Sequence, residues 1–184
     1  QRLAQQYDDA LLTLRRALAL RDDFTEAFAE AALCFLGKAD PANADAPESL
    51  ARAVRYVDRL VELDASRGRL PSFVELQGFV LARVGESSRA RRAFEAIADQ
   101  GSDFARIGLA ILDYRQKRSS SARDALAALG NDPGRAQATQ AFARGLVDAI
   151  DDHANKEQLR DAFARQELGL WQDEGRLRPA IVDE

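Results

Sequence analysis

The sequence predicts an all-α fold, and three observations support that prediction. Alanine, leucine and arginine dominate the chain, and these residues lose little rotamer freedom in a helix. The β-branched residues valine, isoleucine and threonine are sparse, which disfavours a β-rich fold. A short apolar pattern with helical spacing also recurs four times along the 184 residues. Together they indicate a helical chain built from repeated units.

The recurring pattern is a small residue, a large apolar residue four positions later, and an apolar or small residue three positions after that. Offsets of four and seven place the three residues on one face of a helix. The small residue permits close approach of a neighbouring helix, and the large one fills the space beside it. The four copies begin at Ala10, Ala53, Ala90 and Ala122, at intervals that scatter around ~34 residues.

Periodicity and local signals together predict nine helices. Asp23 with Glu26, and Ser72 with Glu75, have the spacing of an N-cap residue and its reciprocal acid. Pro71 suits the first turn of a helix. We expect helices to end at four glycines in the left-handed conformation, which are Gly37, Gly85, Gly101 and Gly130. The expected helices cover residues 2–20, 25–37, 47–64, 72–84, 87–100, 103–117, 120–129, 135–150 and 156–171.

Residues 71–104 resemble one complete repeat of the tetratricopeptide-repeat family. Gly78 stands where the first helix of that repeat needs a small residue, and Gly85 stands at its turn. Ala90 and Phe94 occupy matching places on the second helix. We expect Phe94 to lie between neighbouring helix pairs, with Ala90 beside it.

The resemblance implies a right-handed solenoid of antiparallel helix pairs, about nine helices in all. We expect one domain over residues 1–171 and a C-terminal tail over residues 172–184. The first helix lacks a partner and the chain does not begin with methionine, so we expect a fragment of a longer array. Terminal units of solenoids need capping. We therefore expect exposure or self-association of the apolar face of the first helix, formed by Leu3, Leu11 and Leu14.

The function that the resemblance implies is a non-catalytic scaffold for protein–protein interaction. In that family, ligands lie along a concave face formed by the first helix of each pair. When the family's groove positions are transferred one by one to this sequence, they predict an apolar groove for a partner peptide or protein. It is formed by Leu33, Leu36, Glu75, Leu76, Phe79, Arg83, Ile107, Ile111, Tyr114 and Arg115. The groove lacks the lysine and asparagine residues with which chaperone-binding members hold a C-terminal carboxylate, so we do not expect that activity.

Two features of this groove leave alternatives open. Arg83 and Arg115 occupy the same repeat position, where they either flank an acidic ligand or solvate helix ends, and we favour the second. The apolar face either receives a peptide or is covered by the chain itself. The covering segment would be the insertion at residues 38–47 or the tail at residues 172–184.

The sequence offers little that could support catalysis or hold a metal. His153 is the single histidine, and we favour a solvated loop residue over a general base or metal ligand. Cys34 is the single cysteine, and its apolar neighbours favour a buried thiol over a reactive one. We therefore expect no enzyme activity and no cofactor.

Charge and hydropathy disfavour nucleic acid and membrane as partners. The formal net charge is −4, and acidic residues interleave with the arginines near residues 89–92 and 115–123. No apolar run approaches the ~20 residues that span a bilayer. We expect a soluble part of a larger protein, with cytoplasm and periplasm both open. The alternative function is a structural or regulatory segment of a larger enzyme or an envelope assembly or secretion protein, where the helices position other domains.

Overall fold

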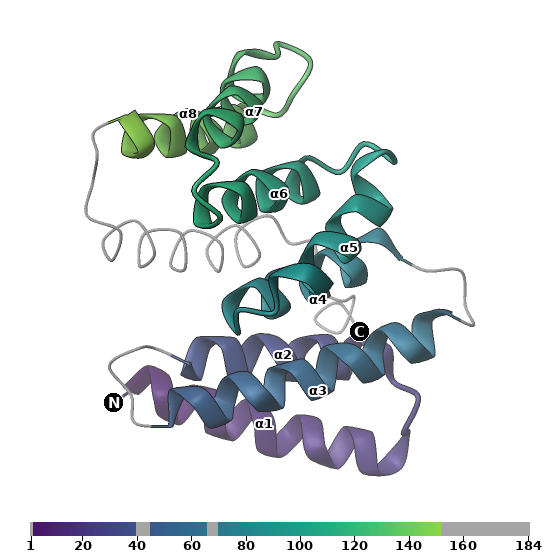
Figure 1. Ribbon diagram of the computed structural model, residues 1–184. Coiled ribbons are helices and arrows are strands. Elements are labelled where there is room, and N and C mark those ends of the chain that lie inside the picture. The colour runs from purple at the N-terminus through teal and green to yellow at the C-terminus, as the bar shows by residue number, and fades with distance from the viewer. Residues whose placement is uncertain (1, 40–44, 66–69, 152–184) are drawn as a thin grey trace.

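The computed structural model describes residues 2–39, 45–65 and 70–151, and every regular element in them is an α-helix. This confirms the predicted all-α class. Figure 1 shows α1, α2 and α3 side by side at one end of the molecule and α7 and α8 at the other. The helices are α1 (Arg2–Leu20), α2 (Thr25–Lys38), α3 (Ala46–Ala65), α4 (Pro71–Arg83), α5 (Ser87–Ala98), α6 (Asp103–Arg115), α7 (Ser119–Asn131) and α8 (Gln137–Asp151).

Each of these eight helices has the bounds that the sequence predicts, to within two residues. The agreement follows from strong 3.6-residue periodicity with clear breaks between segments. The expected ninth helix at 156–171, the expected tail at 172–184 and His153 lie outside the described residues. None of the described helices is both long and apolar enough to cross a membrane.

Each described helix packs against the next one along the chain. In addition, α2 contacts α4, and α4 contacts α6, so alternate helices also meet. The buried apolar residues form two clusters, and α6 contributes to both. Phe104, Ala105 and Leu112 join the cluster that extends back to α1, while Ile107 and Ile111 join the cluster with α7 and α8.

Phe94 fills the junction between α4 and α6. Its side chain is fully buried, and its ring meets that of Phe79 edge-on at 5.1 Å between centroids. A Cβ atom added to Gly108 would lie 2.5 Å from this ring, and one added to Gly78 would also lie within less than 3.0 Å of it. The expectation that Phe94 lies between helix pairs is confirmed, and Ala90 is fully buried one turn earlier on α5.

Two of the four glycines that were expected to stop helices do so. Gly85 and Gly101 have φ values of 85° and 92°, a left-handed conformation that L side chains rarely adopt. Gly37 and Gly130 lie inside α2 and α7, so the expectation is wrong for them. Gly37 instead makes room for the ring of Tyr7 from α1, which a Cβ atom at this position would overlap.

The two expected capping boxes do not form. Phe24 and Leu70 occupy the N-cap positions of α2 and α4, and neither side chain accepts a capping hydrogen bond. Pro71 is in the first turn of α4, as expected. The N–H of Leu70 donates at 2.6 Å to the buried carboxylate of Asp64 at the end of α3. Asp64, six residues earlier in the sequence, therefore accepts from the N-cap N–H of α4, which is the role that the predicted capping box had given to Glu75.

The apolar face of α1 is packed rather than exposed. Leu11 is 4% exposed, and Leu14 and Tyr7 pack against the same core cluster. Among the side chains of this helix that the structure describes, the exposed large apolar ones are Leu12 and Leu20, at 50% and 90%, and the side chain of Leu3 lies outside that set. This corrects the expectation for Leu11 and Leu14, because α2 covers the side of the helix on which they lie.

Candidate functional site

The packed helices already cover most of the predicted groove. Seven of its ten side chains are buried, namely Leu33, Leu36, Glu75, Leu76, Phe79, Ile107 and Ile111. Their burial disagrees with an open groove, one of the two alternatives that the sequence left for this face, and any role of theirs in binding a partner stays a prediction. Arg83, Tyr114 and Arg115 are half-buried. The two segments expected to cover the groove lie largely outside the described residues.

Arg115 binds a helix end. Its Nη1 donates to the carbonyl oxygen of Ala82 at 2.8 Å, in the last turn of α4. Carbonyl groups in the last turn have no partner within their own helix, and a cation there also interacts favourably with the helix dipole. The contact is with the end of α4 and not with the end of the helix that carries Arg115, and whether Arg115 also meets an acidic ligand stays a prediction.

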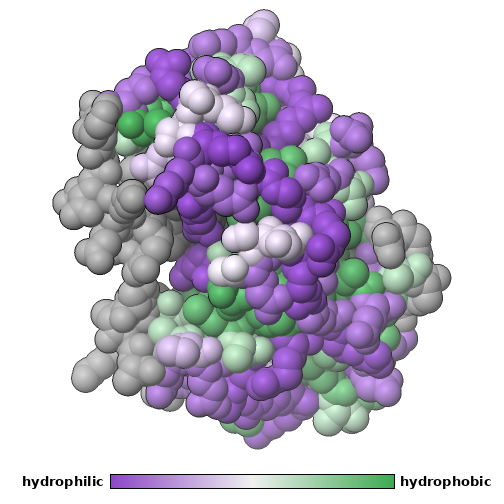
Figure 2. All heavy atoms as spheres, in the orientation of Figure 1, coloured by the Kyte–Doolittle hydropathy of each residue, from purple (hydrophilic) through white to green (hydrophobic). Residues whose placement is uncertain are grey.

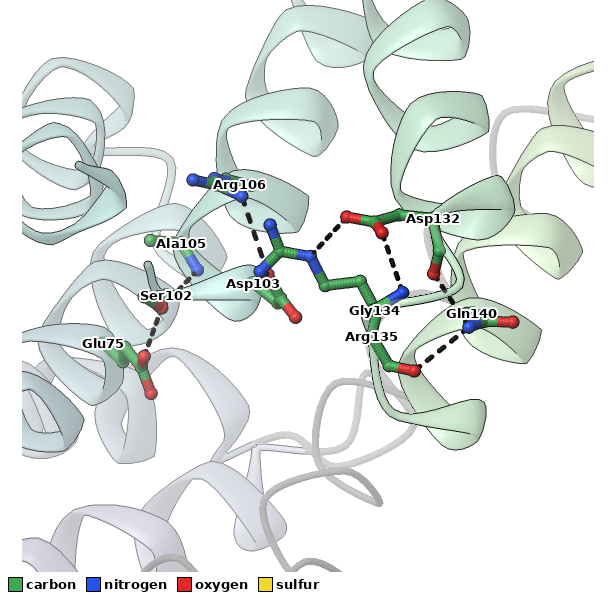
Figure 3. A network of polar contacts seen from close by, with 9 residues as sticks. All are labelled: Glu75, Ser102, Asp103, Ala105, Arg106, Asp132, Gly134, Arg135 and Gln140. Carbon is green, nitrogen blue, oxygen red and sulfur yellow. Dashed lines mark hydrogen bonds and ion pairs between the residues drawn. The ribbon is translucent and has the colours of Figure 1, made fainter. Parts of the chain in front are cut away.

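Glu75 is also part of the packing between helices. Its carboxylate accepts a hydrogen bond from the hydroxyl of Ser102, and this hydroxyl accepts from the N–H of Ala105 at 3.0 Å (Figure 3). Ser102 is the N-cap of α6, so the buried acid orients a capping residue on the helix after next. A carboxylate that is 3% exposed and bound in this way does not present its charge to a ligand.

The same network continues from α6 to the turn before α8. Asp103 accepts from Arg135 at 2.6 Å, and Arg135 also donates to Asp132 at 2.9 Å. The side-chain amide of Gln140 then donates to the carbonyl oxygens of Asp132 and Arg135 (Figure 3). These contacts connect the start of α6 to the turn between α7 and α8.

The two arginine clusters are largely used in ion pairs between helices. Arg89 on α5 pairs with Asp58 on α3 at 2.7 Å, and Arg91 on the same helix pairs with Asp113 on α6. Burial by itself raises the pKa of Asp113, but hydrogen bonds from Arg118 and Arg91 hold it below its usual value. Guanidinium groups held by carboxylates in this way leave less positive charge for an anionic partner.

Cys34 is a buried thiol on α2. Desolvation, with a smaller contribution from the nearby charge of Glu30, raises the pKa of Cys34 to about 11. The thiolate is the reactive form of cysteine, so this thiol is unreactive near neutral pH. Within the described residues, no group of three or more histidine, cysteine, aspartate or glutamate side chains could hold a metal ion.

A surface pocket of about 420 Å³ lies between the first half of α3 and the end of α4. Its lining is mainly apolar, with Arg83 and Glu86 as its charged members, and includes Pro47, Leu50, Ala51, Val54 and Val84. In Figure 2, apolar surface gathers in a hollow between α3 and the turn that follows α4. One predicted groove residue, Arg83, therefore does line an open pocket.

The pocket also explains a second apolar pattern in the sequence of α3. Pro47, Leu50, Ala51 and Val54 are spaced by three, one and three residues, which forms a second apolar stripe beside the buried one. The buried stripe includes Ala53 and Val57. A helix with two adjacent apolar stripes has more apolar surface than one neighbour can cover, and this signal could have indicated the pocket.

Comparison with known proteins adds no further identification. No family model, curated protein or solved structure matches the chain. The function is therefore inferred from the contacts and surfaces of the described residues.

Proposed function

We propose that this chain is a non-catalytic scaffold that binds a partner peptide or protein. We further propose that its helices form a right-handed solenoid of antiparallel pairs, similar to tetratricopeptide repeats. The packing of each helix on the next, together with the α2–α4 and α4–α6 contacts, supports this arrangement. In a repeat array, each unit contacts its neighbours in this way and the stacked units present an extended surface.

The pocket between α3 and α4 is the observation that carries the binding proposal. Its volume lies within the usual range of ligand pockets, and Leu50, Val54 and Val84 give it an apolar lining. Charged side chains beside an apolar centre are typical of binding sites in which the centre gives affinity and the rim gives orientation. We propose that a large apolar side chain of the partner inserts here, next to Arg83 and Glu86.

The experiment that tests this proposal is selection from a phage library of random peptides on the full chain. Ala51 lines the pocket and is itself exposed, so Ala51→Arg fills the pocket without disturbing the core. We expect the selected peptides to share a large apolar residue and to lose about thirtyfold in affinity on Ala51→Arg, as for a hot-spot contact. The matched control is Ala65→Arg, at an exposed position at the other end of α3.

Peptides that bind Ala51→Arg as tightly as the wild type would place binding elsewhere on the chain. A selection that yields no specific peptide, repeated with the melting temperature of the chain verified, would count against a binding role altogether. The selected peptides must still bind Ala65→Arg, since a loss of binding to this control would indicate a general effect of added positive charge.

The alternative is a structural or regulatory segment that positions other domains. The burial of seven predicted groove residues favours it, because those side chains stabilise the chain itself. Phe79→Ala distinguishes the two roles for that part of the chain. Phe79 is 4% exposed and packs against Phe94, so we expect a lower melting temperature and no direct effect on peptide affinity.

A further inference from the structure

The outer face of α1 has a charge pattern that is complementary to itself. Leu12 lies at its centre and is 50% exposed. Asp8 and Asp9 lie one turn before Leu12, and Arg15 and Arg16 lie one turn after it. Among the described helices, α1 packs mainly on α2, through the opposite face that carries Ala10 and Leu14.

The two charge pairs fall on opposite sides of the leucine. At about 100° per residue, Asp9 and Arg16 rotate to one side of Leu12, and Asp8 and Arg15 rotate to the other. Within a single helix, an acid and a base seven residues apart are too distant to pair with each other. The carboxylate of Asp9 and the guanidinium groups of Arg15 and Arg16 make no ion pair within the described residues, whereas Asp8 accepts a hydrogen bond from Lys38.

We propose that this face binds a second copy of the same chain, with the two α1 helices antiparallel about a two-fold axis at Leu12. This arrangement places the two Leu12 side chains against each other. It also places Asp9 beside Arg16 of the second copy, and Asp8 beside Arg15 of the second copy. The two-fold axis repeats each contact, which gives four ion pairs around an apolar centre.

The pattern also selects the orientation. In a parallel pair, Asp8 and Asp9 would face the same acids of the second copy, and Arg15 and Arg16 would face the same bases. Like charges placed opposite each other suppress the wrong arrangement. The pattern therefore favours a closed, antiparallel dimer. This proposal is independent of the α3–α4 pocket, so a dimer would form whether or not the pocket binds a peptide.

Exchange of the two charges tests the proposed dimer. Asp9→Arg and Arg16→Asp each place like charges together in a homodimer, and we expect each variant to raise the dimer Kd by about tenfold or more. Mixed in equal amounts, the two variants become complementary, because an arginine at position 9 then faces an aspartate at position 16. We expect the mixture to form heterodimers about as tightly as the wild type forms homodimers.

The measurement is sedimentation equilibrium of the full chain at concentrations up to about 1 mM. This range is needed because one helix per copy buries less than the ~1,200 Å² of a typical stable interface. The wild-type dimer should weaken as salt is raised, since exposed ion pairs are screened. Arg55→Asp and Glu95→Arg, at exposed positions on α3 and α5, match the two charge changes away from α1 and should leave the Kd unchanged.

Three outcomes would overturn the proposal. The wild type stays monomeric up to about 1 mM, the dimer is indifferent to both charge reversals, or the mixed variants associate no better than each variant alone. If a reversal lowers the melting temperature by itself, the neutral variants Asp9→Asn and Arg16→Gln replace it. A dimer that these variants do not weaken would then use another surface.

Discussion

The ring of Phe94 occupies the space that a side chain on Gly78 would need. A Cβ atom at Gly78 would approach the ring to less than 3.0 Å, closer than real Cβ atoms come to other groups. Gly108, on the other side, has the same relationship to the ring. One aromatic side chain on α5 therefore determines which residues fit on both α4 and α6.

Gly78→Ala should destabilise the chain by about 1–3 kcal/mol, because the added methyl group overpacks the Phe94 pocket. Gly145→Ala is the matched control, since nothing lies within 4 Å of a Cβ atom at this helical position. That substitution should be neutral or stabilising by up to about 1 kcal/mol, through helix propensity. Urea unfolding measures both, and equal effects at the two positions would contradict the packing described for Phe94.

Phe94→Ala should lower the free energy of unfolding by about 3–5 kcal/mol, as truncations of buried aromatic residues do. Ala90→Leu should lower it by about 1–3 kcal/mol, because Ala90 is fully buried and the larger side chain has no space. Thermal and urea unfolding report both changes. A midpoint unaffected by either substitution would mean that α5 packs in a different register.

The Asp113 carboxyl should make stability depend on pH. Its pKa is lowered in the folded chain by Arg118 and Arg91, so its stabilising contribution is present above the unfolded pKa of about 3.9. The contribution is lost as the pH falls through the lower, folded pKa. We therefore expect Asp113→Asn to be less stable than the wild type at pH 7, and the difference to shrink below about pH 4.

The comparison for Asp113 is Asp99→Asn, at an exposed position at the end of α5. Urea titrations of the three proteins between about pH 3 and pH 7 cover the relevant range. A gap between wild type and Asp113→Asn that stays constant across this range would show that the ion pairs with Arg118 and Arg91 do not form in solution.

Cys34 should resist alkylation at pH 8 in the folded chain. Burial raises its pKa to about 11, so very little thiolate is present at pH 8, and the thiol is 8% exposed. The measurement is the rate of labelling by iodoacetamide with increasing urea. We expect the rate to rise along the unfolding transition, and rapid labelling of the fully folded chain would contradict the burial of α2.

The helices and the Phe94 junction could be predicted because they depend on local periodicity. The positions of Ala90 and Phe94 within one helix already indicate the face that meets a neighbour. Burial of the predicted groove could not be predicted in this way. Leu76 and Ile107 were assigned to a groove by resemblance to a repeat family, but whether such positions are open depends on how closely the neighbouring helices pack. No local pattern records that distance.

The prediction of two capping boxes was wrong for a related reason. Ser72 and Glu75 have the spacing of a capping box, yet Glu75 accepts from Ser102 on another helix. Asp64, which no local pattern singled out, accepts from the N–H of Leu70 at the start of α4. A side chain that can reach either a local or a distant partner is assigned by tertiary packing, which spacing alone does not encode.

The position of Phe94 also has a consequence for mechanical and modular behaviour. Many repeat arrays can be shortened, lengthened or grafted one unit at a time, because each junction is served by its own side chains. Here α4, α5 and α6 share one ring, so a cut after α5 would expose one side of Phe94 in the first piece and the face of α6 around Gly108 in the second. When the chain is pulled from its two ends, α4, α5 and α6 should unfold together in a single step. A chimaera with another helical protein should therefore transfer these three helices together.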